Sequence, residues 1–186
     1  ECISQTTNMP KSKIKTIEQS LWDSAIKLRG SVEPGEYKHV VLCLIFLKYI
    51  GDIFKDRYDE LISEGKQKYL DMVEFYAMKN VFYLPEVCRW EFIIKNAKQK
   101  DISIKIDTAL KEIEKKNTSL KGALPNNYFS RLNIDNSKLA ALLDIINNID
   151  LISDKSKDVV GRVYEYFLKQ FSITEKNMKG EFYTPK

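Results

Sequence analysis

The sequence predicts an all-α fold: an irregular bundle of about seven helices that ends in a short extended segment. Apolar residues recur three or four positions apart through most of the 186 residues, which is the spacing of a helix face. Only 7 glycines and 5 prolines are present, too few for a turn-rich β-sandwich. The β-prone run Val81–Leu84 is very short and ends at Pro85.

Two helices are predicted in the first third of the chain. The first covers about 13–29 and ends before Gly30, a common stop signal. The second covers about 36–57. Its middle, Val40–Leu47, is apolar on nearly every side, which predicts burial among several neighbours. Its polar end, Asp52–Glu60, is expected to emerge into solvent.

The same periodicity predicts five more helices, at about 63–78, 86–97, 101–116, 136–148 and 156–171. A loop at 120–128, with Gly122 and Pro125, interrupts this series. The apolar face of the last predicted helix consists of Val160, Val163, Tyr164, Phe167 and Phe171.

Composition and charge exclude several classes of protein. The 30 basic and 26 acidic residues give a net charge of +4, which is compatible with nucleic-acid contact without demonstrating it. The longest apolar run, Val40–Leu47, is far shorter than the roughly 20 residues of a membrane span, and no membrane contact is expected. Residues 1–15 lack the apolar core of a signal peptide. Three cysteines without a paired framework indicate a reducing, cytoplasmic location.

The residues alone indicate no active site. His39 is the only histidine, and a core or boundary position is the favoured interpretation for it. Neither a zinc site nor a Cys–His nucleophile pair is expected, because the three cysteines are widely separated and none neighbours a histidine. The sequence also lacks the glycine-rich loops that cradle phosphates.

Lysines gather in two places. Lys95, Lys98 and Lys100 form the first group, and the second is Lys111, Lys115, Lys116 and Lys121. Acidic residues interleave the second group, as in a solvated helix face with i,i+4 pairs. A surface that contacts DNA phosphates is the alternative, and the first group supplies its candidate residues.

Two segments near the end of the sequence are unusual. Gly161–Leu168 places three aromatic residues within little more than one helical turn. Gly180–Pro185 is a polar and aromatic segment in which Pro185 biases Thr184 toward extended geometry. Such a segment presents its backbone and side chains to a ligand or a neighbouring sheet, although an ordinary terminal loop has the same composition.

These segments, at this separation, resemble the modification subunit of type I restriction–modification systems, an N6-adenine DNA methyltransferase. In that family a helical N-terminal domain ends in a D-x-x-G-x-V-Y-E-Y-F-L pattern, and G-E-F-Y-T-P follows after a short linker. The residues that match the first pattern are Asp158, Gly161, Val163, Tyr164, Glu165, Tyr166, Phe167 and Leu168. The second pattern is complete from Gly180 to Pro185. The helical stretches 21–30, 36–49 and 82–90 are similar as well, so the resemblance covers nearly the whole chain.

The resemblance implies a cofactor and a set of residues that contact it. In the family, G-E-F-Y-T-P opens the methyltransferase domain and lines the S-adenosylmethionine site. The implied cofactor contacts are therefore Glu181, Phe182, Tyr183, Thr184, Pro185 and Lys186. An aromatic ring there can cover the adenine or the sulfonium end of the cofactor.

The implied domains are a flexible N-terminal segment (1–12), a helical domain (13–172), and a linker with the start of a methyltransferase domain (173–186). The resemblance implies that the helical domain helps to engage double-stranded DNA and the specificity subunit, in a complex with a restriction subunit. The motif that holds the target adenine is absent, so we interpret the chain as an N-terminal fragment that is inactive alone. The alternatives are a stand-alone helical protein-interaction module and a helical DNA-binding domain without catalysis.

Overall fold

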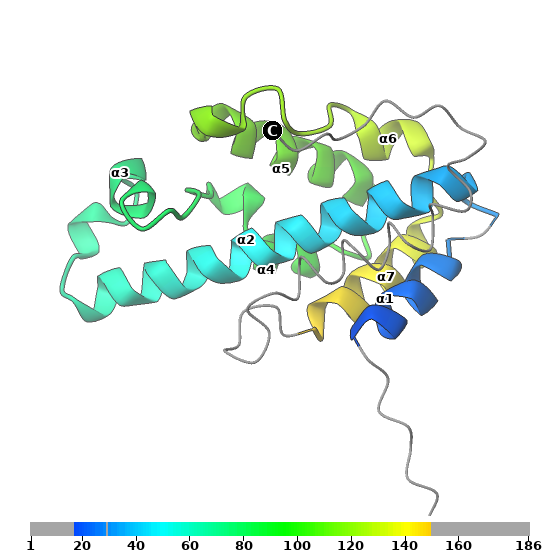
Figure 1. Cartoon of the computed structure of the whole chain (residues 1–186), viewed down its shortest axis with the longest axis horizontal. Coiled ribbons are helices and arrows are strands. Elements are labelled where there is room, and N and C mark those ends of the chain that lie inside the picture. The colour runs from blue at the N-terminus through cyan, green and yellow to red at the C-terminus, as the bar shows by residue number, and fades with distance from the viewer. Residues whose placement is uncertain (1–16, 29, 150–186) are drawn as a thin grey trace, which may run out of the picture.

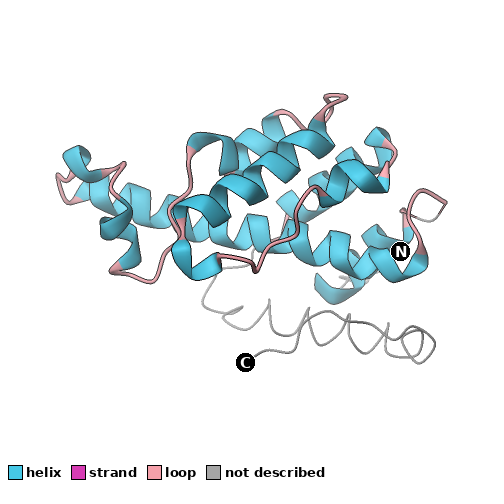
Figure 2. Cartoon of the chain, turned by 90° about the horizontal axis from the view of Figure 1, so that it is seen from above, coloured by secondary structure: helices cyan, strands magenta, loops and turns pink. Residues whose placement is uncertain are grey.

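The structure is a computed structural model that describes residues 17–28 and 30–149 (Figure 1). Throughout these residues every regular element is a helix, as Figure 2 shows, and the predicted all-α class is confirmed there. The helix predicted at 156–171 and the extended C-terminal segment lie outside the described residues. The count of about seven helices and the three domain boundaries therefore stay predictions.

The α-helices are α1 (Ile17–Ile26), α2 (Tyr37–Ser63), α3 (Val73–Ala77), α4 (Trp90–Lys95), α5 (Ile102–Lys116), α6 (Tyr128–Leu132) and α7 (Asn136–Asn147). Helix α2 has 27 residues and runs the length of the described domain in Figure 1. Helices α1, α4 and α7 pack against it. The middle of α2 is buried as predicted, with Val40, Leu44 and Leu47 fully inaccessible to solvent. No helix in the described residues is both long enough and apolar enough to cross a membrane.

The C-terminal half of α2 is only partly exposed, so the prediction for 52–60 is wrong on one face. Lys55, Asp56, Asp59 and Glu60 are exposed, but Phe54 and Arg57 are buried. Phe54 stacks on Tyr76 with ring centroids 4.9 Å apart, and the Arg89 guanidinium lies 4.9 Å from the Phe54 ring. The Arg57 Nε donates to the carbonyl oxygen of Phe75 at 2.9 Å. The aromatic residues of 75–83 therefore cover this end of α2.

The prediction of a helix at 63–78 is wrong, because α2 continues to Ser63 and, within the rest of that range, only Val73–Ala77 is α-helical. Gly65 has a φ of +72°, a conformation that glycine adopts at little cost. The Lys66 N–H then donates to the Leu61 carbonyl at 2.8 Å, which closes the helix in the manner of a Schellman motif. A glycine two positions past the last helical residue thus ends α2.

The β-prone segment at 81–84 forms no helix, and it pairs with no strand in the described residues. Its backbone pairs instead with the side chain of Asn117, the residue that follows α5. The Tyr83 N–H donates to Asn117 Oδ1 at 3.0 Å, and Asn117 Nδ2 donates to the Tyr83 carbonyl at 2.9 Å. The same amide nitrogen also donates to the Ile113 carbonyl at 2.8 Å. One side chain therefore supplies the hydrogen bonds that a neighbouring strand would supply.

Helix α6 was not predicted, although the loop that precedes it was. It has only five residues and starts after Asn127, whose φ is +50°. The Asp107 carboxylate, which belongs to α5, accepts hydrogen bonds from the backbone N–H groups of Phe129 and Ser130, each at 2.9 Å. These groups have no partner within a helix of this length, so a residue 22 positions away caps α6.

Helices α5 and α7 lie within one residue of their predicted bounds. Each presents a regular apolar face to the core, formed in α5 by Ile102, Ile106, Leu110 and Ile113. Asp135 caps α7, since its carboxylate accepts from the Ser137 N–H at 2.9 Å and the Lys138 N–H at 3.2 Å. Helix α7 ends beside α4, where it completes a groove.

Candidate functional site

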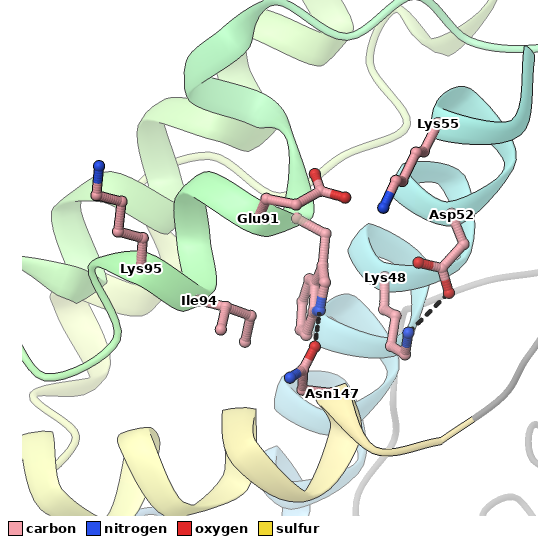
Figure 3. Close-up of a pocket in the computed structure, with 8 residues that line it drawn as sticks. Lys48, Asp52, Lys55, Glu91, Ile94, Lys95 and Asn147 are labelled. Carbon is pink, nitrogen blue, oxygen red and sulfur yellow. Dashed lines mark hydrogen bonds and ion pairs between the residues drawn. The ribbon is translucent and has the colours of Figure 1, made fainter. Parts of the chain in front are cut away.

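A groove with a volume of about 450 Å³ lies where α2, α4 and the C-terminal end of α7 meet (Figure 3). Its lining residues are Lys48, Asp52, Lys55, Trp90, Glu91, Ile94, Lys95 and Asn147. In Figure 3 the Lys55 ammonium points toward the carboxylates of Asp52 and Glu91. The Lys95 ammonium points away from them. Three lysines and two acidic residues therefore give the groove a mixed charge.

The groove owes its shape to a close approach of α2 and α4. Gly51 of α2 faces the start of α4, and a Cβ atom at Gly51 would lie 2.9 Å from the Trp90 Cβ. Real Cβ atoms do not come that close, so only glycine admits the α4 backbone here. Trp90 is 3% exposed, and its indole Nε1 donates to Asn147 Oδ1 at 2.9 Å. This bond ties α4 to the end of α7.

The groove contains an acid, Asp52, whose pKa is shifted from its ordinary value. Partial burial raises the pKa of its carboxyl, while the ion pair with Lys48, at 2.7 Å, acts in the opposite direction. Lys48 is itself nearly buried, with a side-chain exposure of 8%. The pair therefore joins a nearly buried ammonium to a partly buried carboxylate. The polar side chains among the described lining residues are lysines, carboxylates, the indole N–H of Trp90 and the amide of Asn147.

The predicted DNA contacts, Lys95, Lys98 and Lys100, all lie exposed at the end of α4 and in the loop that joins it to α5. None of them makes an ion pair within the described residues. Asn136 Nδ2 donates to the Lys100 carbonyl at 3.2 Å, which holds this loop against the start of α7. The structure thus brings the three candidates together on one fixed segment, with their charges available to a partner.

Lysines predominate from the end of α4 to the end of α5. Residues 95–116 contain seven lysines against four acidic residues, a net charge of +3, and the chain as a whole carries +4. One of the four acids, Asp107, is buried and caps α6. The exposed row of α5, opposite its core face, is Ile104, Thr108, Lys111 and Lys115. Lys111 and Lys115 of the second lysine group therefore lie on the exposed face of α5.

The predicted cofactor residues, Glu181–Lys186, lie outside the described residues, and the structure does not test them. Within the described residues, no group of three or more His, Cys, Asp or Glu side chains is placed to hold a metal ion. His39 is half-buried on α2. Burial raises the pKa of the thiols of Cys43 and Cys88 to about 12, so neither is a nucleophilic thiolate at neutral pH.

Sequence reasoning missed the groove. The i,i+4 spacing of Lys48 and Asp52 predicts their ion pair, but it does not show that both are desolvated. Trp90 and Asn147 are 57 positions apart, and no local pattern joins them. The glycine inside a long apolar helix was the available indication of a close backbone approach.

Comparison with known proteins gives two adjacent family matches. Residues 17–149, which comprise nearly all of the described structure, match the family described as HsdM N-terminal domain. Residues 155–186 match the family described as N-6 DNA Methylase. A helical domain followed directly by methylase sequence defines the class of protein, the DNA methylase subunit with a helical N-terminal domain. The chain belongs to the HsdM N-terminal domain family, the modification subunits of type I restriction–modification systems.

Three curated relatives agree with this assignment. The chain is 35% identical to the type I restriction enzyme MjaIX methylase subunit of Methanocaldococcus jannaschii over 185 residues, which is 91% of this chain and 33% of that protein. It is 23% identical to the MpnII methylase subunit of Mycoplasma pneumoniae over 203 residues, 91% of this chain and 37% of that protein. Identity to the HindI methylase subunit of Haemophilus influenzae is 33% over 90 residues, 44% of this chain and 20% of that protein. The chain thus spans about a third of the length of the first two.

Proposed function

We propose that this chain is the part of a type I modification subunit that engages DNA and the specificity subunit, and that the whole subunit methylates adenine N6 with S-adenosylmethionine. The observation that supports this function best is the order of the two family matches, with helical-domain sequence at 17–149 and methylase sequence at 155–186. The restriction subunit is the further partner that this assignment implies. The chain alone is expected to transfer no methyl group, because it lacks the motif that holds the target base.

The DNA contact is proposed for the end of α4 and the loop that follows it. Lys95, Lys98 and Lys100 are exposed there, and the side chain of Asn136 fixes the loop. A fixed group of ammonium ions meets phosphates with less loss of conformational freedom than a mobile one. The exposed lysines of α5, Lys111, Lys115 and Lys116, are further candidates for phosphate contact. Phosphate contacts of this kind position a protein on DNA without reading its sequence, and the specificity subunit is the partner proposed to read it.

Charge reversal tests this contact. Replacing Lys95, Lys98 and Lys100 together with glutamate should weaken duplex binding by the complete subunit in its complex. The slope of log K against log salt should also fall by about 3, since each lost phosphate contact contributes about 0.9. Fluorescence anisotropy with labelled duplex at several salt concentrations measures both quantities.

The matched control is a triple glutamate variant of Lys66, Lys68 and Lys79, three lysines in the segments on either side of α3. It carries the same change in net charge, so its salt slope should stay close to that of the unmodified protein. An equal loss of DNA affinity in both variants would show a net-charge effect, and it would remove Lys95, Lys98 and Lys100 from the DNA site.

The cofactor role of 181–186 has its own test. S-adenosylmethionine binding needs converging groups that bury most of the ligand, and a short segment does not supply them alone. Calorimetry should therefore show binding by the complete subunit but not by residues 1–186. In the complete subunit, Tyr183→Ala and Thr184→Ala should each weaken binding about tenfold, the loss of one good contact. Full affinity in both variants, or tight binding by 1–186, would contradict the assignment.

A further inference from the structure

The buried guanidinium of Arg57 has a methionine sulfur among its acceptors. Arg57 lies on α2 and is only 4% exposed, so its N–H groups need acceptors within the protein. The Nη1 atom donates to the Glu60 carboxylate at 2.6 Å, and the Nε atom donates to the Phe75 carbonyl at 2.9 Å. The Nη2 atom donates to the Met78 Sδ at 3.6 Å. A thioether is a weak acceptor, so a buried, charged donor has a poor partner here.

Met78 is open to solvent. It follows the last residue of α3 and is 65% exposed, more than any other exposed large apolar residue of the described structure. An exposed side chain can meet an oxidant in solution, and a methionine that does so becomes a sulfoxide. The sulfoxide carries an oxygen atom on the sulfur, and this oxygen is a stronger hydrogen-bond acceptor than the thioether.

The position of Met78 determines what this oxidation does to the fold. Oxidation of a buried methionine disrupts packing, because it makes an apolar side chain polar. Met78 loses little, since most of its surface already lies in solvent. The Arg57 Nη2 gains an oxygen acceptor, and a hydrogen bond from a charged donor is about twice as strong as one between neutral groups. Because Arg57 also binds the Phe75 carbonyl, the stronger bond adds to an existing link between α2 and α3.

We propose that Met78 is a site of oxidation by peroxide and that Arg57 binds the resulting sulfoxide, so that oxidation holds α3 more firmly on the end of α2 (Figure 1). The Met78 sulfur attacks one oxygen of hydrogen peroxide, and the S–O bond forms as the O–O bond breaks. The hydroxide that leaves takes the proton from the transferred oxygen and becomes water. The sulfur loses two electrons, and the peroxide gains them. The inference does not depend on the function proposed above, and its test involves no DNA and no methyl donor.

Hydrogen exchange before and after peroxide treatment tests the proposal. The Met72→Leu variant of the 186-residue chain is used, because it removes the other exposed methionine of the described residues. Peptide mass spectrometry identifies the oxidised residue. The amides of Met78, Lys79 and Val81, which donate to carbonyls within 74–76, should then exchange about tenfold more slowly, for the gain of one charge-assisted hydrogen bond.

Oxidation of Met72 in a Met78→Leu variant is the matched control. Met72 is also exposed, at 43%, but no hydrogen bond to its sulfur occurs in the described residues. Its oxidation should therefore not slow exchange at 78–81. The double variant, Met72→Leu with Met78→Leu, receives the same treatment and accounts for oxidation at Met9 and Met178, which lie outside the described residues.

Arg57→Lys identifies the donor. Lysine keeps the positive charge but has no planar fork with which to bind the Phe75 carbonyl and residue 78 together. Combined with Met72→Leu, it should abolish the slowing that oxidation causes. Met78→Gln keeps the test valid if Arg57→Lys loosens α3, because the glutamine amide oxygen is an acceptor in place of the sulfoxide oxygen. With Arg57 intact, Met78→Gln should exchange more slowly at 79–81 than Met78→Leu.

Four results would overturn the proposal. The first is a Met78 that peroxide leaves unoxidised while Met72 reacts. The second is exchange at 78–81 that is unchanged or faster once Met78 is oxidised. The third is an equal slowing in the Arg57→Lys variant or on oxidation of Met72, since the bond to Arg57 would then not be the cause. The fourth is a Met78→Gln variant that exchanges no more slowly than Met78→Leu.

Discussion

Replacing Asn117 with alanine should lower the free energy of unfolding by about 3–5 kcal/mol, because two buried backbone groups of Tyr83 lose their partners at about 1–3 kcal/mol each. Asn117 is 8% exposed, and its amide makes three hydrogen bonds, two to Tyr83 and one to Ile113. Water cannot replace these bonds without opening the segment. Urea unfolding followed by circular dichroism measures the change.

Two further variants identify the cause of the loss. Asn117→Asp keeps the size of the side chain and one acceptor, but it brings a carboxylate oxygen against the carbonyls of Tyr83 and Ile113. It should therefore be at least as destabilising as alanine. The control is Asn148→Ala, the exposed asparagine that follows α7 and donates to the Asp144 carbonyl. Its cost should stay below about 1 kcal/mol, as for an exposed hydrogen bond. Equal losses at the two asparagines would contradict the argument.

Helices α5 and α7 were predictable because each buries one face, and the apolar residues of that face repeat at helical spacing. In α5 the spacing of Ile102, Ile106 and Ile113 points these side chains to one side, and Ile104 is the large apolar residue that lies on the exposed face. The sequence therefore determines both the element and the face that it buries. The same holds for α7, where Asp135 also supplies the cap.

The short elements were not predictable, since their partners are far away in sequence. Helix α6 depends on Asp107, and the segment at 81–84 depends on Asn117, 34 positions from Tyr83. Within its own neighbourhood Asn117 is one polar residue after a helix, a position that requires no distant bond. The error at 63–78 had a local cause, because Gly65 stops α2 and was available as a stop signal.

The candidate site also has one part that could be predicted from the sequence and one part that could not. Three candidate residues, Lys95, Lys98 and Lys100, lie within six positions, so their proximity could be predicted from the sequence. All three are exposed to solvent in the structure. The groove needs α2, α4 and α7 together, and its geometry rests on Gly51 and on the Trp90–Asn147 bond. Contacts of this kind follow from the packing of the whole domain.

Replacing Asp107 with alanine should lower the free energy of unfolding by about 2–4 kcal/mol. The lost cap accounts for about 1–2 kcal/mol, and the buried N–H of Phe129 left without a partner for a similar amount. Asp107 is 7% exposed and Phe129 is fully buried, so solvent does not reach these groups while α6 stays in place. Helix α6 should then open before the rest of the domain, and hydrogen exchange at Phe129 and Ser130 measures this directly.

Asp101→Ala in the residue before α5 is the matched control. Asp101 is exposed, its side chain caps no helix in the described part of the chain, and it forms an ion pair with Lys105 on the surface. Its loss should cost at most about 1 kcal/mol, as surface ion pairs do. Asp107→Asn should fall between the two, because its single oxygen can accept from only one of the two N–H groups at full strength. If Asp107→Ala exchanges at Phe129 no faster than the unmodified chain, α6 is held by its apolar contacts alone, and the carboxylate is not its cap.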